Sequence, residues 1–215
     1  MSSSQPAGGT VPVGGGEVPL LNIANVLTVL RLVMVPVFVA ALFAGDGQDV
    51  FWRTTAFLVF VLAALTDRLD GQLARSRGLV TWFGALADPI ADKALTGAAL
   101  VGLSMLGLVP WWVTVVILGR ELGITVLRFV VIRRGVIAAS RGGKAKTVAQ
   151  TVAIALILFP LPLLLPGWLG AVVVLQWTAL VIALVLTVVT GIDYVVKAVR
   201  AGANPAPDGS GAVER

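Results

Sequence analysis

The stretch that decides the fold is residues 57–75, FLVFVLAALTDRLDGQLAR, where an apolar run passes directly into a segment with two aspartates. A bilayer-spanning helix needs roughly 20 apolar residues, and continuous rather than alternating apolar runs favour helices over strands. Because lipid cannot hydrogen-bond to an open backbone, we predict an all-α, polytopic membrane bundle of six transmembrane helices. The six apolar runs lie at about 23–44, 51–70, 85–108, 111–132, 147–165 and 169–196.

Composition supports a membrane domain and narrows its chemistry. Of the 215 residues, 58% are hydrophobic, and the mean hydropathy is +0.97. Low-complexity ends predict disordered tails at 1–20 and 201–215 around a six-helix membrane domain at 21–200. The chain contains no cysteine and no histidine. Disulfide chemistry is therefore excluded, and a general base must be a carboxylate or a lysine.

The basic residues predict the orientation in the membrane. Arg75 and Arg77 fall in the second connection, and five Lys or Arg residues crowd 133–146, whereas the third and fifth connections have none. The positive-inside rule then places the second and fourth connections and both termini in the cytoplasm. This topology, together with contact with anionic membrane lipids, accounts for the net charge of +5. We therefore expect no nucleic-acid partner.

Four acids lie within 26 residues, at the membrane edge of two successive runs. Asp67 and Asp70 are three residues apart on one helix face, and Asp88 and Asp92 are four apart on the next helix. The connection between the two helices is short, so they should be antiparallel neighbours that bring both pairs together. Carboxylates that converge in a low dielectric repel one another unless cations bind them. An all-oxygen site suits Mg²⁺ or Mn²⁺, and four acids have room for two ions.

Small residues and an arginine accompany these acids. Gly71, Ala74 and Gly84 would let a substrate or another helix approach closely, and Arg75 offers a planar fork for phosphate oxygens. A purely structural role is possible for each residue alone: salt bridges for the first two aspartates, an N-cap for Asp88, and helix packing for the small residues. Four acids together inside a membrane segment favour a functional site.

The spacing Asp67-x-x-Asp70-Gly71-x-x-Ala74-Arg75, eight residues, Gly84-x-x-x-Asp88-x-x-x-Asp92 resembles the complete signature of the CDP-alcohol phosphatidyltransferases. The resemblance implies a metal-dependent enzyme in which an acceptor hydroxyl attacks the β-phosphorus of a CDP-linked substrate and displaces CMP. It implies that all four aspartates bind metal and that Asp92 is also the base. The residues implied for the CDP-lipid site are Gly71, Ala74 and Arg75, with Thr81, Asn25 and Thr28 as further candidates.

Longer stretches resemble one branch of the family, the bacterial phosphatidylglycerophosphate synthases. They are NIANVLTVLRLVMVPVF (22–38), DPIADK (88–93), ILGRELGITVLR (117–128) and GGKAKTVAQ (142–150). This resemblance implies CDP-diacylglycerol as donor and sn-glycerol 3-phosphate as acceptor. It also implies a homodimer in the bacterial plasma membrane, with the active site facing the cytoplasm.

The acceptor phosphate requires cations near the metal site. Lys144 and Lys146 begin the fifth run, where the helix dipole also favours an anion, and Arg128 and Arg31 are further candidates. Alternatively, the lysines are topology anchors and Arg31 extends to the membrane surface. Arg120 lies deep in the fourth run and needs a partner. We expect that partner to be a carboxylate on another helix, because the adjacent Glu121 points elsewhere on its own helix.

Other functions fit parts of this pattern. Intramembrane carboxylates would also serve a divalent cation transporter. Within the same family, the chain could be a phosphatidylinositol phosphate synthase, a CDP-diacylglycerol–serine transferase or a cardiolipin synthase. A catalytically idle scaffold is disfavoured by the four intact aspartates.

Overall fold

A computed structural model describes residues 23–77, 82–131 and 141–203. These residues form helices and contain no strand, which confirms the all-α prediction for the part described. Six helices of 18 residues or more match the six predicted runs within these ranges. They are α1 (Ile23–Phe43), α2 (Val50–Arg77), α3 (Trp82–Met105), α4 (Trp111–Val131), α5 (Arg141–Leu158) and α7 (Leu169–Ala203). Three short helices join them: η1 (Ala44–Gly47), α6 (Leu161–Leu164) and η3 (Pro166–Trp168).

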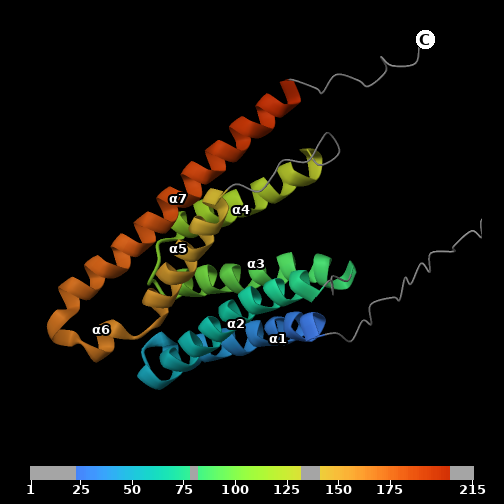
Figure 1. The fold of residues 1–215 in the computed structure, drawn as a ribbon. Helices are drawn as coiled ribbons and strands as arrows, with labels where there is room; N and C mark the ends of the chain where they lie inside the picture. The colour runs from blue at the N-terminus through green and yellow to red at the C-terminus, as the bar shows by residue number, and fades with distance from the viewer. Residues whose placement is uncertain (1–22, 78–81, 132–140, 204–215) are drawn as a thin grey trace, which may run out of the picture.

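The long helices form two groups that meet along α3 (Figure 1). One group is α1, α2 and α3. In the other, α4 and α5 pack against α7, and contacts of α3 with α4 and α5 and of α2 with α5 join the groups. Successive long helices reverse direction, so α1, α3 and α5 begin at the end where α2, α4 and α7 finish (Figure 1). We call this the N-terminal end of the bundle and the opposite one the far end.

Helix length and exposure fit a bilayer. In the described residues, three segments are long and apolar enough to span a membrane: Val26–Gly47, Gly143–Leu164 and Pro166–Arg200. Two shorter apolar segments are Val50–Thr66 and Lys93–Met105. Exposed tryptophans mark the far end, as expected at a membrane–water interface; they are Trp52, Trp111, Trp112 and Trp168. The chain is thus a polytopic helical membrane protein.

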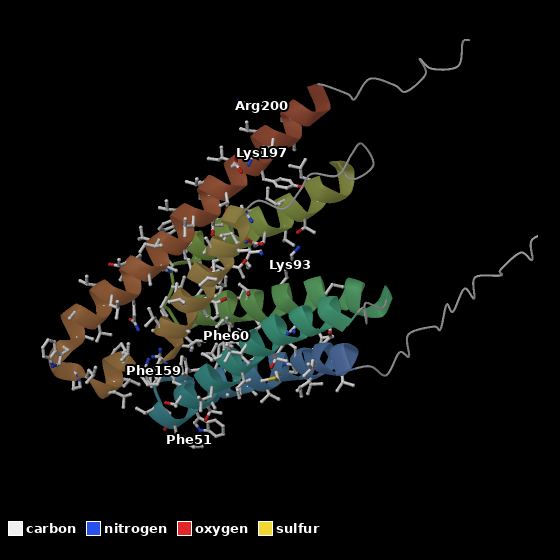
Figure 2. The ribbon with its side chains drawn as sticks, viewed as in Figure 1. Phe51, Phe60, Lys93, Phe159, Lys197 and Arg200 are labelled. Carbon is white, nitrogen blue, oxygen red and sulfur yellow. The ribbon has the colours of Figure 1, made fainter. Side chains whose placement is uncertain are left out.

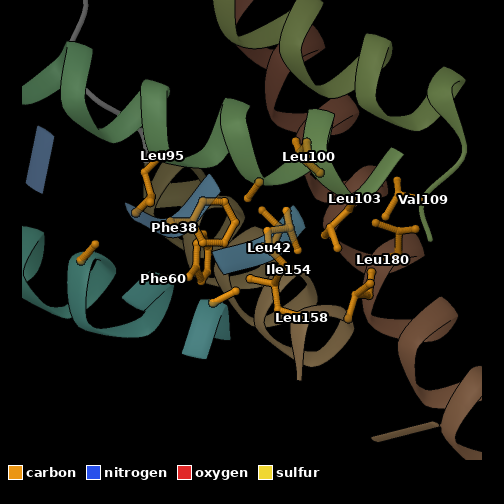
Figure 3. Packing of buried hydrophobic residues seen from close by; sticks show 14 of the residues in the cluster. Phe38, Leu42, Phe60, Leu95, Leu100, Leu103, Val109, Ile154, Leu158 and Leu180 are labelled. Carbon is orange, nitrogen blue, oxygen red and sulfur yellow. The ribbon is translucent and has the colours of Figure 1, made fainter. Parts of the chain in front are cut away.

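The core draws buried side chains from all six long helices (Figure 3). The rings of Phe38 in α1 and Phe60 in α2 lie with their centroids 5.9 Å apart, and Leu95 of α3 lies beside them (Figure 3). Lipid is as apolar as these side chains, so close packing rather than escape from water holds such helices together. Gly102 shows how close the packing is, because an added Cβ would lie 2.5 Å from a methyl carbon of Leu42.

Buried polar contacts tie the helices at the far end. Arg53, in the first turn of α2, is buried and donates to the carbonyl oxygen of Ile157 at 2.5 Å. That carbonyl lies in the last turn of α5, where backbone acceptors lack helical partners and a cation is favourable. Ser104 of α3 and Thr114 of α4 share a hydrogen bond of 2.7 Å.

Candidate active site

The predicted acidic site continues the buried stripes of α2 and α3. On α2 the buried positions 53, 56, 60 and 63 recur at intervals of three or four residues, and the same spacing leads on to Asp67 and Asp70. On α3 the buried positions 91, 95 and 99 lead back, by the same spacing, to Asp88 and Asp92. Helical spacing therefore predicts that all four aspartates continue the buried faces of α2 and α3.

Helical spacing also predicts that two of these aspartates share one layer of the bundle. Phe60 and Leu95 lie together in the core (Figure 3), and Asp67 and Asp88 are each seven residues from them. α2 and α3 are antiparallel, so both intervals run toward the N-terminal end. Seven residues make nearly two turns, a rise of about 10 Å. The predicted metal layer thus lies two turns from the aromatic core, with position 67 on the α2 side and position 88 on the α3 side of the contact between these helices.

α1 adds a cation and a hydroxyl to this layer. Arg31 is seven residues before Phe38, the partner of Phe60, and it is 0% exposed. Because α1 and α2 are antiparallel, Arg31 lies level with Asp67, and Thr28, which is also buried, lies level with Asp70. The expectation that Arg31 extends to the membrane surface is wrong, because its helix position faces the neighbouring helices. Burial at this level suits Arg31 to balance the negative charge of the predicted aspartate layer.

A cavity of about 230 Å³ opens between α3, α4 and α5, next to the acidic layer. Its wall on α3 includes Lys93 and Thr96, which follow Asp92 by one and four residues. Two cations and a carboxylate face it together with hydroxyl and amide groups, so the cavity suits a small, polar, negatively charged molecule. Its full lining is Lys93, Thr96, Gly97, Leu118, Glu121, Leu122, Lys146, Thr147, Gln150 and Thr151.

Glu121 of α4 is the centre of a polar network around this cavity. Its Oε1 atom accepts a hydrogen bond from the ammonium of Lys146 on α5, which is 6% exposed. Lys93 reaches from α3 toward α4 (Figure 2) and donates to the hydroxyl of Thr125. Thr125 in turn donates to the carbonyl oxygen of Glu121 at 2.8 Å. The network links both lysines of the wall to Glu121, Lys146 through the carboxylate and Lys93 through Thr125 and the backbone carbonyl oxygen.

Arg120 extends the network to α7. Its Nη1 atom lies 3.2 Å from Oε1 of Glu121, and its Nη2 donates to the hydroxyl of Thr190 at 2.9 Å. The expectation that Glu121 points away from Arg120 is therefore wrong: flexible side chains let these neighbours meet although their Cβ directions diverge. Gln150 provides a second link, donating to the hydroxyl of Thr187 on α7 at 3.0 Å.

The structure separates the predicted acceptor-binding residues. Lys146 lines the cavity and is buried, whereas Lys144 is exposed and does not line it. Arg31 lies in the acidic layer, apart from the residues that form the cavity wall. The side chains of the four aspartates, Asn25, Ala74, Arg75 and Arg128, as well as Gly71 and Thr81, lie outside the part that the structure describes.

Sequence reasoning missed Lys93, Glu121 and Gln150 as site residues. Lys93 directly follows an acid of the signature and Gln150 follows Lys146 by one helical turn, so helical spacing was a usable signal for both. Glu121 had only its charge within an apolar run as a signal, which by itself marks a functional candidate.

A sequence model of the CDP-alcohol phosphatidyltransferases matches residues 21–198 of this chain. The chain belongs to this family. The matched segment contains the acidic layer, the cavity and all six long helices up to Ala198 of α7. Members of the family are metal-dependent transferases, and the four signature aspartates of this phosphatidyltransferase lie within the matched segment.

Comparison with curated relatives indicates which branch of the family the chain resembles. The phosphatidyltransferase is 57% identical over 198 residues to a Mycobacterium tuberculosis protein named "Probable phosphatidylglycerophosphate synthase", which covers 92% of this chain and 90% of the relative. It is 37% identical over 189 residues to the CDP-diacylglycerol–glycerol-3-phosphate 3-phosphatidyltransferase of Bacillus subtilis, across 83% of this chain and 95% of that protein. A Rickettsia felis protein of the same name is 34% identical over 178 residues.

Proposed function

We propose that this phosphatidyltransferase transfers the phosphatidyl group of CDP-diacylglycerol to sn-glycerol 3-phosphate, giving phosphatidylglycerophosphate and CMP. The observation that carries this proposal is the small cationic cavity, whose wall on α3 includes Thr96, one helical turn after Asp92 of the acidic signature. The relatives from Mycobacterium tuberculosis and Bacillus subtilis, which are named for this reaction, support the choice of acceptor.

The four aspartates are the proposed metal ligands. Their spacing continues the buried faces of α2 and α3, and four carboxylates form the oxygen donor set that Mg²⁺ or Mn²⁺ prefers. Among the side chains that the structure does describe, no three acidic groups gather into an alternative cation site. When bound, two divalent ions would neutralise charge on the pyrophosphate and on the departing CMP.

The residues of the chain then have separate roles in the transfer. Asp92 takes the proton of the acceptor hydroxyl as its oxygen bonds to the β-phosphorus, and the bond from that phosphorus to CMP breaks. Gly71 and Ala74 leave room for the cytidine diphosphate, and Arg75 binds its phosphate oxygens. Thr28, level with Asp70, and Asn25, one turn earlier on α1, lie on the same side of the acidic layer. With Thr81, they are the further nucleotide-binding candidates.

The cavity is the proposed site for the acceptor. Lys146 and Lys93 replace part of the hydration that a phosphate dianion loses on leaving water. Arg128 remains a further candidate on the last turns of α4. The cavity volume of about 230 Å³ corresponds to roughly seven or eight water molecules. It thus suits a molecule of the size of glycerol phosphate and is too small for a diacylated lipid.

The proposed setting is the plasma membrane of a bacterium, as a homodimer, with the N-terminal end of the bundle in the cytoplasm. The two water-soluble reactants, the substrate glycerol 3-phosphate and the product CMP, would then exchange with the cytoplasm. The Lys/Arg asymmetry of the connections supports this orientation.

The decisive experiment supplies purified protein in nanodiscs with CDP-diacylglycerol, Mg²⁺ and a panel of acceptors. The acceptors are sn-glycerol 3-phosphate, inositol 1-phosphate, serine and phosphatidylglycerol. We expect CMP release and phosphatidylglycerophosphate only with glycerol 3-phosphate, and loss of both when a chelator removes the metal. Turnover with a different acceptor would reassign the branch, and full turnover in metal-free buffer would refute the metal site.

A further inference from the structure

We propose that Glu121 is a specificity-determining residue whose carboxylate accepts a hydrogen bond from the C2 hydroxyl of the acceptor. The inference rests on the proposed function, because it assigns a role to one wall of the proposed acceptor cavity. Glycerol 3-phosphate presents three polar groups: a phosphate, the primary hydroxyl that attacks, and the C2 hydroxyl between them. Each needs its own partner in a site shielded from water.

The first two groups already have partners near the cavity. Lys93 and Lys146 supply positive charge for the phosphate, and Asp92, the residue before Lys93, is the proposed base for the attacking hydroxyl. The C2 hydroxyl then requires an acceptor or donor on the remaining wall. Glu121 of α4 lines that wall, on a different helix from both Asp92 and Lys146.

The carboxylate has an oxygen to offer. Both of its hydrogen bonds from described side chains, from Lys146 and from Arg120, end on Oε1. Oε2 accepts no hydrogen bond from the part of the chain that the structure describes. The Glu121 side chain is 19% exposed, so it is held by two cations yet retains access to a ligand.

A carboxylate in a phosphate-binding cavity is unfavourable for the phosphate itself, since like charges repel. Glu121 has two possible roles. If it only neutralises Arg120 and Lys146, its role is structural. If it also binds the C2 hydroxyl, the site should reject an analogue that lacks this hydroxyl. The two roles can be separated with an acceptor that differs from the substrate only at C2.

The experiment compares sn-glycerol 3-phosphate with 3-hydroxypropyl phosphate, which keeps the phosphate and the primary hydroxyl but lacks the C2 hydroxyl. Its readout is the ratio of kcat/KM for the two acceptors, with CDP-diacylglycerol and Mg²⁺ saturating. For the wild type we expect a preference of about tenfold to a hundredfold for glycerol 3-phosphate, the effect of one charged hydrogen bond. Glu121→Gln replaces the charged acceptor with an uncharged amide, whose hydrogen bond is weaker, so the ratio should fall at least about threefold below the wild-type value.

Lys146→Met is the matched control, because it breaks the same ion pair from the other side. It should weaken both phosphorylated acceptors by a similar factor and leave their ratio at the wild-type value. Any general loosening of the network caused by Glu121→Gln acts on both acceptors and cancels in the ratio. The selective loss is therefore specific to the hydroxyl contact.

Several outcomes would overturn the inference. They are a wild-type enzyme that does not discriminate between the acceptors, a wild-type ratio retained in Glu121→Gln, and an equal fall of the ratio in Lys146→Met. Should Glu121→Gln fail to fold, Glu121→Asp replaces it: its shortened side chain should lower the ratio, and an unchanged ratio counts against the contact. A wild-type protein that uses neither acceptor would refute the proposed function instead.

Discussion

Arg120 of α4 stands directly over Gly191 of α7, where an added Cβ would lie 3.1 Å from the Cγ and Nε atoms of the arginine. The same guanidinium donates to Thr190 at 2.9 Å, so one side chain both packs on α7 and bonds to it. The absence of a side chain at position 191 is what permits this approach. The contact orients Arg120 and, through it, the carboxylate of Glu121 at the cavity.

Arg120→Met should therefore loosen the α4–α7 contact while keeping much of the packing. Hydrogen bonds between membrane helices contribute about 1–2 kcal/mol, and we expect a loss of stability of that size. The measurement is thermal unfolding of the purified protein in detergent. Val189→Ala, on the 57%-exposed neighbouring position of α7, is the control and should melt like the wild type. Equal melting temperatures for Arg120→Met and the control would contradict a tie between the helices.

Asp92→Asn should abolish turnover with retention of the fold and of CDP-diacylglycerol binding. Asparagine keeps the shape of the side chain but cannot take a proton from the acceptor hydroxyl. Loss of a general base usually lowers the rate by about 10² to 10⁴. CMP release measures turnover, and a fluorescent CDP-lipid measures binding. A variant that works at the wild-type rate would require another base.

Lys146 and Lys144 form a natural pair for testing the acceptor site, two residues apart on α5 with opposite exposure. Lys146→Met should raise the KM for glycerol 3-phosphate by about tenfold to a hundredfold, since a hydrogen bond to a charged group contributes about 1.5–3 kcal/mol. The KM for CDP-diacylglycerol should change little. Lys144→Met, whose parent side chain is exposed, should have the smaller effect. Identical acceptor constants in both variants and the wild type would make both lysines topology anchors.

Membrane orientation can be tested directly because the chain contains no cysteine. A cysteine at Gln48, in the connection after η1 at the far end, should react with an impermeant thiol reagent added to intact cells. A cysteine at Ala139 should react only after the cells are opened. Labelling in the reverse order would place the N-terminal end of the bundle outside the cell.

The sequence predicted the helices well, because membrane insertion depends on local composition. The apolar run at 23–44 became Ile23–Phe43, and the run at 111–132 became Trp111–Val131. Hydropathy does not register the proline at position 160, so α5 ends at Leu158 rather than 165. It also detects the apolar part of a helix and not its polar ends. α5 thus begins at Arg141 rather than 147, and α7 continues to Ala203 beyond 196.

In the candidate site, too, local sequence allows some features to be predicted and not others. Helical spacing is local, so it predicts a common face for each pair of aspartates, and this stays a prediction because their side chains lie outside the described residues. The partner of Arg120, the burial of Arg31 and the role of Glu121 were not predictable, because they depend on which helices touch and at which level. Those facts follow from contacts such as Phe38 with Phe60, which join residues 22 positions apart and leave no trace in local spacing.

The seven-residue intervals that link the aromatic core to the acidic layer have an evolutionary consequence. Arg31, Asp67 and Asp88 keep their common level only while the segments 31–38, 60–67 and 88–95 have equal length. Inserting one residue into any of them would rotate the functional group by about 100° and shift it by about 1.5 Å. Substitution within these segments should therefore be tolerated far more readily than insertion or deletion, whereas the connections between helices can vary in length. We therefore expect the lengths of these three short segments to be as constrained as the acids themselves.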